Sequence, residues 1–503
     1  MLREAGVPIR AAIIVMKQMV ERIQNYQDLQ ILANQDITVS SLMLKAAARL
    51  ETLPLQQAKE VGIWRDRSTY FLNIAYPSMQ AMAEVKSEQV TSCDAKTGRT
   101  VALYVHVPFC TAECYYCHYY KEFAKSPDYV DGYLEGIEQE LDMQEKRFGG
   151  LQVASVYIGG GTPSYMNPNQ IGRLFTSIKR HVAFQKGIEV SFEMHPESAT
   201  EDKLAVLSKY GVNRISIGVE SFNNTLLAKE SRRHTVEEVI EAFERVKAAG
   251  FRNVNLDLIY GLRGQTVDMW EESLDQIVAL QPASTTMYYL RLKKGTPEYN
   301  LWKAQPQTFP TDYELLLMHA MNFERMEGEL GYLQSPVDWY IKDKSLFHQY
   351  QDHNWRKSDE TELLGIGPSA YSYVDGWQYY NINDTGRWVT MLGNGDLPIW
   401  KGERLEEDEK LRRTVMLGMK MGMDRPAFKQ TYGTDVVEAF PKIWERLAQL
   451  GLVEIKYDSV DLTYTGKLFA DEVGQQFYSD PMKLRMARID PVLVSTTWPQ
   501  FNP

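Results

Sequence analysis

Short apolar runs alternate with helical stretches between residues 100 and 300, and this alternation constrains the fold more than any other feature. Six runs have the length and composition of strands, and a helix-length stretch follows each of the first five. Strands that are separated by helices pair in parallel, and right-handed crossovers curl such a sheet. The pattern predicts an α/β fold with a partial (β/α)6 barrel, in which chemistry lies at the carboxyl ends of the strands. The predicted strands are 101–107, 153–159, 188–194, 213–219, 254–261 and 285–292.

The rest of the chain divides into three further regions. Residues 1–98 are expected to form a helical N-terminal extension, because apolar residues recur at helical spacing over 11–32 and 40–61, with a break at Pro54. The barrel is expected over 99–300. Residues 301–395 are expected to flank it, with a long helix at 312–331 and a glycine- and aromatic-rich substrate-side loop at 361–374. Residues 396–503 are expected to form a winged-helix-like domain, because helices precede a hairpin-like run at 450–466. We favour a capping role for that domain over DNA binding.

Composition excludes several functional classes. The net charge of −11 and the isoelectric point near 5.4 argue against a nucleic-acid binder. The most apolar early stretch, Ala11–Met16, is too short for a signal sequence or a membrane span. Four cysteines, three of them clustered, do not make a disulfide framework. We therefore expect a cytoplasmic protein with a small-molecule substrate, no nucleic-acid partner and no membrane segment.

Three cysteines lie within eight residues, at Cys110, Cys114 and Cys117, in the loop after the first predicted strand. The spacing C-x3-C-x2-C lets three thiolates hold three irons of a [4Fe–4S] cluster and leaves the fourth iron open to a cofactor. The alternatives are a structural zinc site, with His106 or His118 as fourth ligand, and a group of buried apolar thiols. We favour the cluster, because such a cysteine group is improbable by chance and follows a barrel strand.

A glycine-rich segment and a group of tyrosines lie near these cysteines in the sequence. Residues 159–163, GGGTP, follow the second predicted strand, and their N–H groups can bind a carboxylate or a phosphate; a tight turn is the alternative. The tyrosines surround the last cysteine, and either packing over the cluster or stacking on a flat ligand explains them. They are Tyr115, Tyr116, Tyr119 and Tyr120.

Charged residues at strand ends predict a shared polar site. Glu193 ends the third predicted strand, Glu220 follows the fourth, and Asp257 lies in the fifth. Their carboxylates can accept hydrogen bonds from hydroxyl or amino groups of a ligand, although each alone is also explained as a helix cap or a paired core acid. Arg232 or Arg233 can pair with a ligand carboxylate. No catalytic residue is assigned, and no histidine receives a role.

Six motifs, in order, resemble the oxygen-independent coproporphyrinogen III oxidase (HemN-like) family of radical S-adenosylmethionine enzymes. They are YVHVPFC at 104–110, CYYC at 114–117, GGGTPS at 159–164, SIGVESF at 216–222, NLDLIYGL at 255–262 and ELLGIGPSAYSY at 362–373. The resemblance covers about 100 to 480 and leaves the N-terminal extension outside.

The resemblance implies a [4Fe–4S] cluster on the three cysteines and S-adenosylmethionine on the open iron, which is split to give a 5′-deoxyadenosyl radical. It also implies an electron donor such as flavodoxin or ferredoxin. The residues that match the family's cofactor-binding motifs are Tyr104, Tyr116, Gly160, Gly161, Thr162, Glu193, Glu220, Arg232 and Asp257.

Two positions depart from the family pattern. Tyr119 stands where the resembling oxidases have a further cysteine, and Glu220 replaces a glutamine. The leading hypothesis is therefore a radical enzyme that modifies an unsaturated or aromatic small molecule, with methyl or methylene transfer from a second S-adenosylmethionine as its specific version. The alternatives are oxidative decarboxylation of coproporphyrinogen III and a haem-trafficking protein on the same fold.

Overall fold

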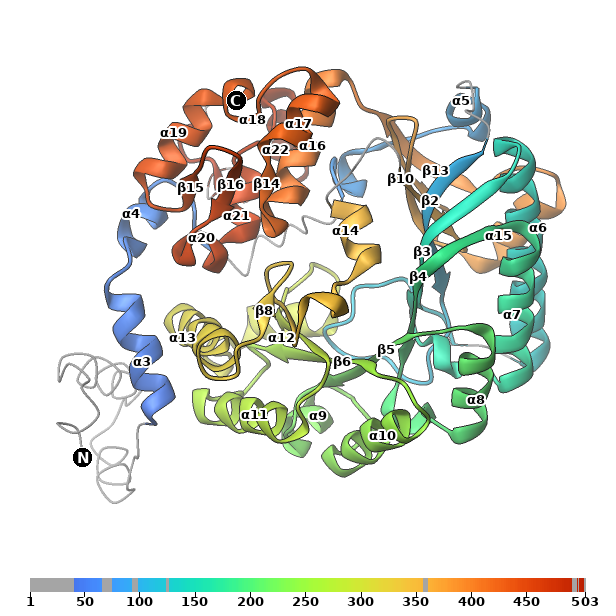
Figure 1. Ribbon diagram of the computed structural model, residues 1–503, viewed down its shortest axis with the longest axis horizontal. Helices are drawn as coiled ribbons and strands as arrows, with labels where there is room; N and C mark the ends of the chain where they lie inside the picture. Colours follow the sequence, from blue (N-terminus) through green and yellow to red (C-terminus); the bar gives the residue numbers. More distant parts are fainter. Residues whose placement is uncertain are drawn as a thin grey trace.

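The computed structural model describes residues 40–65, 75–92, 98–123, 126–355, 361–490, 495 and 497–501 (Figure 1). Within these ranges one large mixed sheet has the strand order β1-β13-β12-β11-β10-β2-β3-β4-β5-β6-β7-β9-β8. The order runs from one free edge to the other, so the curved sheet stays open. A small second sheet, β14-β16-β15, lies in the C-terminal part.

The six predicted strands form the parallel centre of the large sheet. They lie side by side in chain order, and each neighbouring pair is parallel, which confirms the α/β class and the barrel-like architecture. Their bounds are β2 (Arg99–Val107), β3 (Leu151–Gly160), β4 (Ala183–Met194), β5 (Arg214–Glu220), β6 (Asn253–Tyr260) and β7 (Ser284–Tyr289).

The predicted crossover helices lie on the outer side of this sheet (Figure 1). Two of them begin with capping boxes, formed by Asn167 with Gln170 and by Thr235 with Glu238, as expected for a helix that starts abruptly after a strand. Apolar residues of the helices and strands form one continuous core between the two layers. The predicted helices are observed as α6 (Pro127–Phe148), α7 (Pro168–His181), α8 (Glu201–Tyr210), α10 (Val236–Ala248) and α11 (Val267–Leu280). The short helix α9 (Asn224–Lys229) was not predicted.

The predicted loop at 361–374 is wrong, because this segment contains two strands. Strand β10 pairs with β2 in parallel, and β11 follows it antiparallel. A Cβ at Gly365 would lie 2.3 Å from the carbonyl oxygen of Tyr371, so glycine is required for the close approach of the two strands. The glycines suggested a loop, whereas they serve strand packing. The strands at this edge are β10 (Thr361–Ile366), β11 (Tyr371–Val374), β12 (Trp377–Asn381) and β13 (Ile399–Arg404).

Further elements lie between β7 and β13 in the chain. The predicted helix at 312–331 is observed as α13 followed by a π-helical turn at 324–329. Helix α14 lies on the concave side and packs against β2, β3, β4 and β10 (Figure 1). The elements are α12 (Pro297–Ala304), α13 (Asp312–Phe323), β8 (Leu333–Gln334), β9 (Trp339–Ile341), α14 (Gln349–Trp355) and α15 (Thr385–Gly393).

The C-terminal region contains the predicted hairpin, as β15 and β16, among short helices. Within the described part of the chain, no helix is long and apolar enough to cross a membrane. The elements are α16 (Glu407–Gly418), β14 (Met423–Asp424), α17 (Arg425–Tyr432), α18 (Val436–Ala439), α19 (Pro441–Gln449), β15 (Val453–Ile455), β16 (Ser459–Leu462), α20 (Tyr464–Leu468), α21 (Ala470–Gln475) and α22 (Asp480–Ile489).

The N-terminal extension packs against the region that contains the large sheet and against the C-terminal region. Helix α3 (Ser41–Glu51) begins at the Ser40 cap, and the chain breaks at Pro54 before α4 (Leu55–Glu60), as predicted. The predicted helix at 11–32 lies outside the described residues. Strand β1 (Ala83–Glu84), followed by α5 (Ser87–Thr91), pairs with β13 and becomes an edge of the large sheet.

Candidate active site

A cavity of about 400 Å³ opens at the carboxyl ends of the central strands. Each of the three predicted cluster cysteines and each of the nine predicted cofactor contacts lines this cavity. The pairing register of β2 with β3 brings the loops after these strands together, because Val107 at the end of β2 is paired with Gly160 at the end of β3. The cysteine loop, residues 108–123, and the glycine loop, residues 159–163, therefore start at the same level.

Main-chain hydrogen bonds fix the cysteine loop. The N–H of Cys110 donates to the carbonyl of Glu122, at 3.0 Å, and the N–H of Glu122 donates to the carbonyl of Pro108, at 2.7 Å. The N–H of Cys117 donates to the carbonyl of Cys114, at 3.0 Å. Burial raises the pKa of Cys110 to about 11, so binding of a metal centre there includes loss of a proton from a buried thiol.

The three thiols are not arranged as the ligands of a single metal ion. Ligands of one tetrahedral zinc ion lie about 4 Å apart, since each Zn–S bond is about 2.3 Å. The sulfurs of Cys110, Cys114 and Cys117, all in the described part of the chain, do not all lie within 4.8 Å of one another. His106 is excluded as a fourth ligand, because its ring nitrogens bond the Tyr104 hydroxyl, at 3.0 Å, and a main-chain carbonyl. His118, the other candidate, lines the cavity, and its ring stacks on that of Tyr119 with centroids 4.5 Å apart. The three thiols suit a [4Fe–4S] cluster with one open iron.

The glycine loop packs against the cysteine loop, and the expectation that its N–H groups are available to a ligand is wrong. The N–H of Gly161 donates to the carbonyl of Val107, at 2.7 Å, and the N–H of Thr162 donates to the carbonyl of Phe109, at 2.8 Å. The N–H of Gly160 donates to a carboxylate oxygen of Glu193, at 3.2 Å. These donors hold the two loops together, so an anionic group of a ligand needs other partners.

Three carboxyl groups on neighbouring strands face the cavity. Glu193 accepts a hydrogen bond from the Tyr157 hydroxyl, at 2.6 Å, and Asp257 accepts one from the Ser216 hydroxyl, at 2.7 Å. Burial raises the pKa of Glu193 and of Glu220 to about 7, and the charge of Asp257 adds to both shifts. Burial also raises the pKa of Asp257. A ligand with ammonium or sulfonium charge would be stabilised here, because it would offset this crowding of negative charge.

Glu220 is held in an unusual backbone conformation. Its φ is 65°, in the left-handed region that residues with a side chain seldom adopt. The pairing register of β5 with β6 shifts between Gly218 and Glu220. A bulge of this kind redirects a side chain at the end of a strand, and here it places the carboxyl in the cavity.

Arg232, rather than Arg233, is the arginine that reaches into the site. Its Nη2 donates to the carbonyl of Gly218, at 2.6 Å, and its Nη1 lies 3.6 Å from the sulfur of Cys114. Its Nη2 also lies 3.6 Å from a carboxylate oxygen of Glu220, and its Nε is buried with no hydrogen-bond partner among the described residues. The Tyr116 hydroxyl is buried beside the same Glu220 carboxyl and lowers the pKa of that group. Arg233 also lines the cavity but is exposed. A buried guanidinium N–H without a partner in the wall of a cavity suits the carboxylate of an amino-acid ligand.

Sequence reasoning missed Arg214 in β5 and the cavity residues from β7 onward. Arg214 gave a signal, since it is a charged residue in an apolar strand, and it is 2% exposed at the start of β5. The residues from β9, α14 and β11 gave none, because only the tertiary fold brings them to the cavity. The missed lining residues include Tyr288, Tyr289, Arg291, Trp339, His348, Tyr350, Gln351, Asn354, Trp355 and Tyr371.

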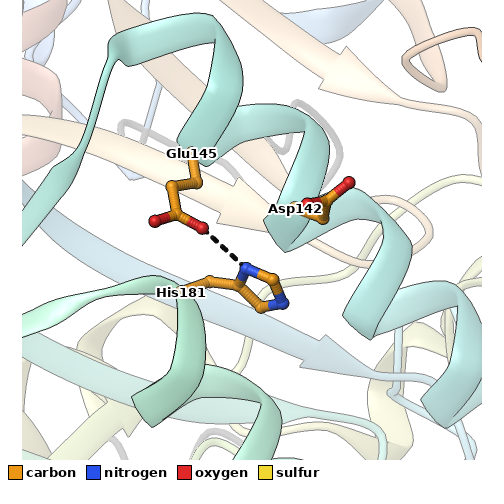
Figure 2. A group of neighbouring side chains, drawn as sticks. All are labelled: Asp142, Glu145 and His181. Atoms are coloured by element: carbon orange, nitrogen blue, oxygen red, sulfur yellow. Dashed lines mark hydrogen bonds and ion pairs between the residues drawn. The ribbon is translucent and has the colours of Figure 1, made fainter.

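A second group of metal-ligand types lies outside the cavity, on α6 and α7. Figure 2 shows the His181 ring directed at Glu145, with Asp142 one turn away on the same helix as Glu145. The ring nitrogens already contact Glu145, at 2.8 Å, and Glu138, at 3.1 Å, while Asp142 pairs with Lys146 at 2.6 Å. This group is therefore an ion-pair network that joins two helices.

Comparison with known proteins places this geometry in a class. The model of the radical SAM superfamily matches residues 104–277, and the model of the HemN C-terminal domain matches residues 405–469. The chain is 32% identical to the heme chaperone HemW of Lactococcus lactis over 343 residues, which are 67% of this chain and 88% of that protein. It is 27% identical to the oxygen-independent coproporphyrinogen III oxidase of Pseudomonas aeruginosa over 401 residues, 76% of this chain and 86% of the other.

The solved structure of coproporphyrinogen III oxidase (HemN) from Escherichia coli is also similar, with a TM-score of 0.71 and 25% identity over 80% of this chain and 96% of that chain. Fold and site together define a radical S-adenosylmethionine enzyme. The chain belongs to the HemN-like family, which includes the coproporphyrinogen oxidases and HemW. Its cofactors are a [4Fe–4S] cluster and S-adenosylmethionine, as predicted.

Proposed function

We propose that Cys110, Cys114 and Cys117 hold the cluster and that the enzyme modifies a flat, unsaturated small molecule in the same cavity. The observation that carries this proposal is the convergence of all the predicted cluster and cofactor residues on one cavity at the carboxyl ends of the strands. When bound, the cluster and S-adenosylmethionine supply a 5′-deoxyadenosyl radical, and the protein supplies position and shielding.

Different residues of the cavity bind different groups of the cofactor. Arg232 binds the carboxylate of the cofactor, since its Nε is a buried donor without a partner among the described residues. Glu193, Glu220 and Asp257 accept hydrogen bonds from its amino and ribose groups, which also offsets their mutual repulsion. These contacts orient the cofactor on the open iron and limit the access of water to the reacting atoms.

The remaining cavity wall favours a flat substrate. From β7 onward, six of the eleven residues that line the cavity are tyrosine or tryptophan, and such rings contribute large apolar surfaces with defined stacking geometry. The aromatic residues of this wall are Tyr288, Tyr289, Trp339, Tyr350, Trp355 and Tyr371.

The specific reaction that we propose is transfer of a methyl or methylene group from a second S-adenosylmethionine to an sp² carbon. Its support is the sequence departure at Tyr119, which lines the cavity where the resembling oxidases carry a cysteine. Iron–sulfur centres prefer soft thiolate ligands, so the phenol of Tyr119 is a poorer ligand for such a centre than a cysteine at this position.

Product analysis under strictly anaerobic conditions tests both the radical reaction and the transfer of a methyl or methylene group. The enzyme is incubated with dithionite, methyl-labelled S-adenosylmethionine and a panel of flat unsaturated compounds that includes haem and coproporphyrinogen III. We expect 5′-deoxyadenosine, S-adenosylhomocysteine and label in a product, and none of these from the Cys114→Ala variant. Absence of 5′-deoxyadenosine overturns the radical reaction, whereas 5′-deoxyadenosine without labelled product overturns only the transfer.

Oxidative decarboxylation of coproporphyrinogen III is the second candidate, and its support is the similarity to proteins named for that activity. Anaerobic growth of a strain that lacks this activity, complemented with the gene for this chain, tests it. Heme delivery has support from the similarity to HemW. Haem titration of the protein, with 5′-deoxyadenosine measured in parallel, distinguishes delivery from catalysis. For either reaction we propose flavodoxin or ferredoxin as the electron donor.

A further inference from the structure

Arg65, in the N-terminal extension, is buried where the barrel meets the C-terminal region. Only 8% of it is exposed. Its Nη2 donates to the carbonyl of Leu468, at 2.5 Å, and its Nη1 donates to the hydroxyl of Tyr260 on β6, at 3.3 Å. Its Nε lies 3.9 Å from a carboxylate oxygen of Glu472, and its guanidinium carbon is 4.6 Å from the ring centre of Tyr289. One side chain thus connects three regions of the protein.

Two residues of this neighbourhood reach the active-site cavity. Tyr289 and Arg291 both line it. Arg291 lies over the same Tyr289 ring, at 5.1 Å, pairs with Asp471, and approaches Glu472 to 3.7 Å. Arg65 and Arg291 therefore share an aromatic ring and a carboxylate, so the position of each depends on the other.

Neighbouring contacts of the extension hold Arg65 in this position. The Nε1 of Trp64 donates to Asp312 at the start of α13, at 3.2 Å, and its ring packs on Phe469, with centroids 5.5 Å apart. Helix α3 packs along α13, as Figure 1 shows. Farther on, Tyr76 is fully buried, its hydroxyl donates to Glu409, and its ring packs on that of Tyr478. The extension is anchored on both sides of Arg65.

We propose that Arg65 is a positioning residue for the substrate: it fixes Tyr289 and Arg291 in the cavity wall, and through it the N-terminal extension shapes the substrate side of the site. This inference rests on the proposed function, because it assumes that the cavity takes a substrate beside the cofactor. Removing the guanidinium takes one cation from the Tyr289 ring and leaves the Tyr260 hydroxyl and Glu472 each with one partner fewer. None of the predicted cluster or cofactor residues contacts Arg65 through these bonds.

Binding of two ligands to cluster-containing enzyme tests the proposal. The variants are Arg65→Gln and, as a matched control, Arg49→Gln. Arg49 is an exposed arginine of the same extension that lies over Tyr464, at 4.7 Å, and contacts the C-terminal region without these contacts to β6 and β7. Coproporphyrin III serves as a flat, carboxylated probe. We expect Arg65→Gln to weaken probe binding at least fivefold and to change S-adenosylmethionine binding less than twofold. Arg49→Gln should change neither by more than twofold, and Arg65→Lys should recover part of the loss.

Hydrogen exchange supplies a readout that needs no substrate. In Arg65→Gln we expect faster amide exchange across 284–291, with exchange across the cysteine loop unchanged. An equal loss of both ligands would overturn the proposal in favour of a general structural role, and so would unchanged probe binding with unchanged exchange at 284–291. If the unmodified enzyme does not bind coproporphyrin III, the exchange result decides. Failure of the proposed function would instead appear as absent 5′-deoxyadenosine in the unmodified enzyme.

Discussion

Replacing Gly161 by alanine should displace the cysteine loop from its support. The added Cβ would lie 2.9 Å from the carbonyl oxygens of Pro108 and Phe109, closer than such atoms can approach. The loop would move, and two main-chain hydrogen bonds would weaken: Gly161 to Val107, at 2.7 Å, and Thr162 to Phe109, at 2.8 Å. Each is worth about 1 kcal/mol, so we expect the free energy of unfolding to fall by about 2 kcal/mol.

The same movement should reduce cluster binding, because Cys110 follows Phe109 directly. The measurements are iron per chain after anaerobic purification and the free energy of unfolding in urea. Gly132→Ala is the control, since a Cβ at this position in α6 meets nothing within 4 Å, and alanine in a helix stabilises by up to about 1 kcal/mol over glycine. Equal iron content and equal stability in Gly161→Ala and the unmodified protein would refute the role assigned to this contact.

Three further substitutions have defined outcomes. Arg232→Lys keeps the charge but loses the planar fork that spans the Gly218 carbonyl and the Cys114 sulfur, so calorimetry should find S-adenosylmethionine binding at least tenfold weaker at equal iron content. Glu140→Gln should lower the free energy of unfolding in urea by about 1–3 kcal/mol. The Glu140 carboxylate accepts hydrogen bonds from three buried donors, on Gly367, Asn381 and Trp388, and an amide would place its NH₂ group against one of them. Unchanged stability would contradict this. Burial and the neighbouring Glu298 raise the pKa of Glu230 to about 8. Between pH 4.5 and pH 8 the folded state therefore keeps a proton on this carboxyl that the unfolded state has released. The free energy of unfolding should fall as the pH rises through this range. Glu230→Gln should flatten that fall, and an unchanged pH profile of unfolding would refute the assignment.

Local patterns predicted much of this protein. The strand and helix periods located the six parallel strands, and the Ser40 cap and Pro54 located the break between α3 and α4. Glu193 and Asp257 indicated the cavity, because a charged side chain within an apolar strand needs a polar partner or a ligand. These features are readable because each depends on neighbours within a few residues of the same segment.

Errors arose where a residue's role depends on a distant segment. The glycines at 361–374 suggested a loop, but Gly365 serves close packing of β10 against β11. The N–H groups of Gly161 and Thr162 suggested an anion site, but carbonyls of the cysteine loop occupy them. Neither partner can be identified from the spacing within one motif.

The amino-acid sequence by itself determined the class of fold, the three thiols and the chemistry that those thiols imply, since alternation and ligand spacing are short-range properties. Only the tertiary structure decided that α14 lies on the concave side of the sheet and that Arg65 reaches the cavity wall through Tyr289. Such contacts join segments separated by tens to hundreds of residues, and chain packing selects them after the local elements have formed.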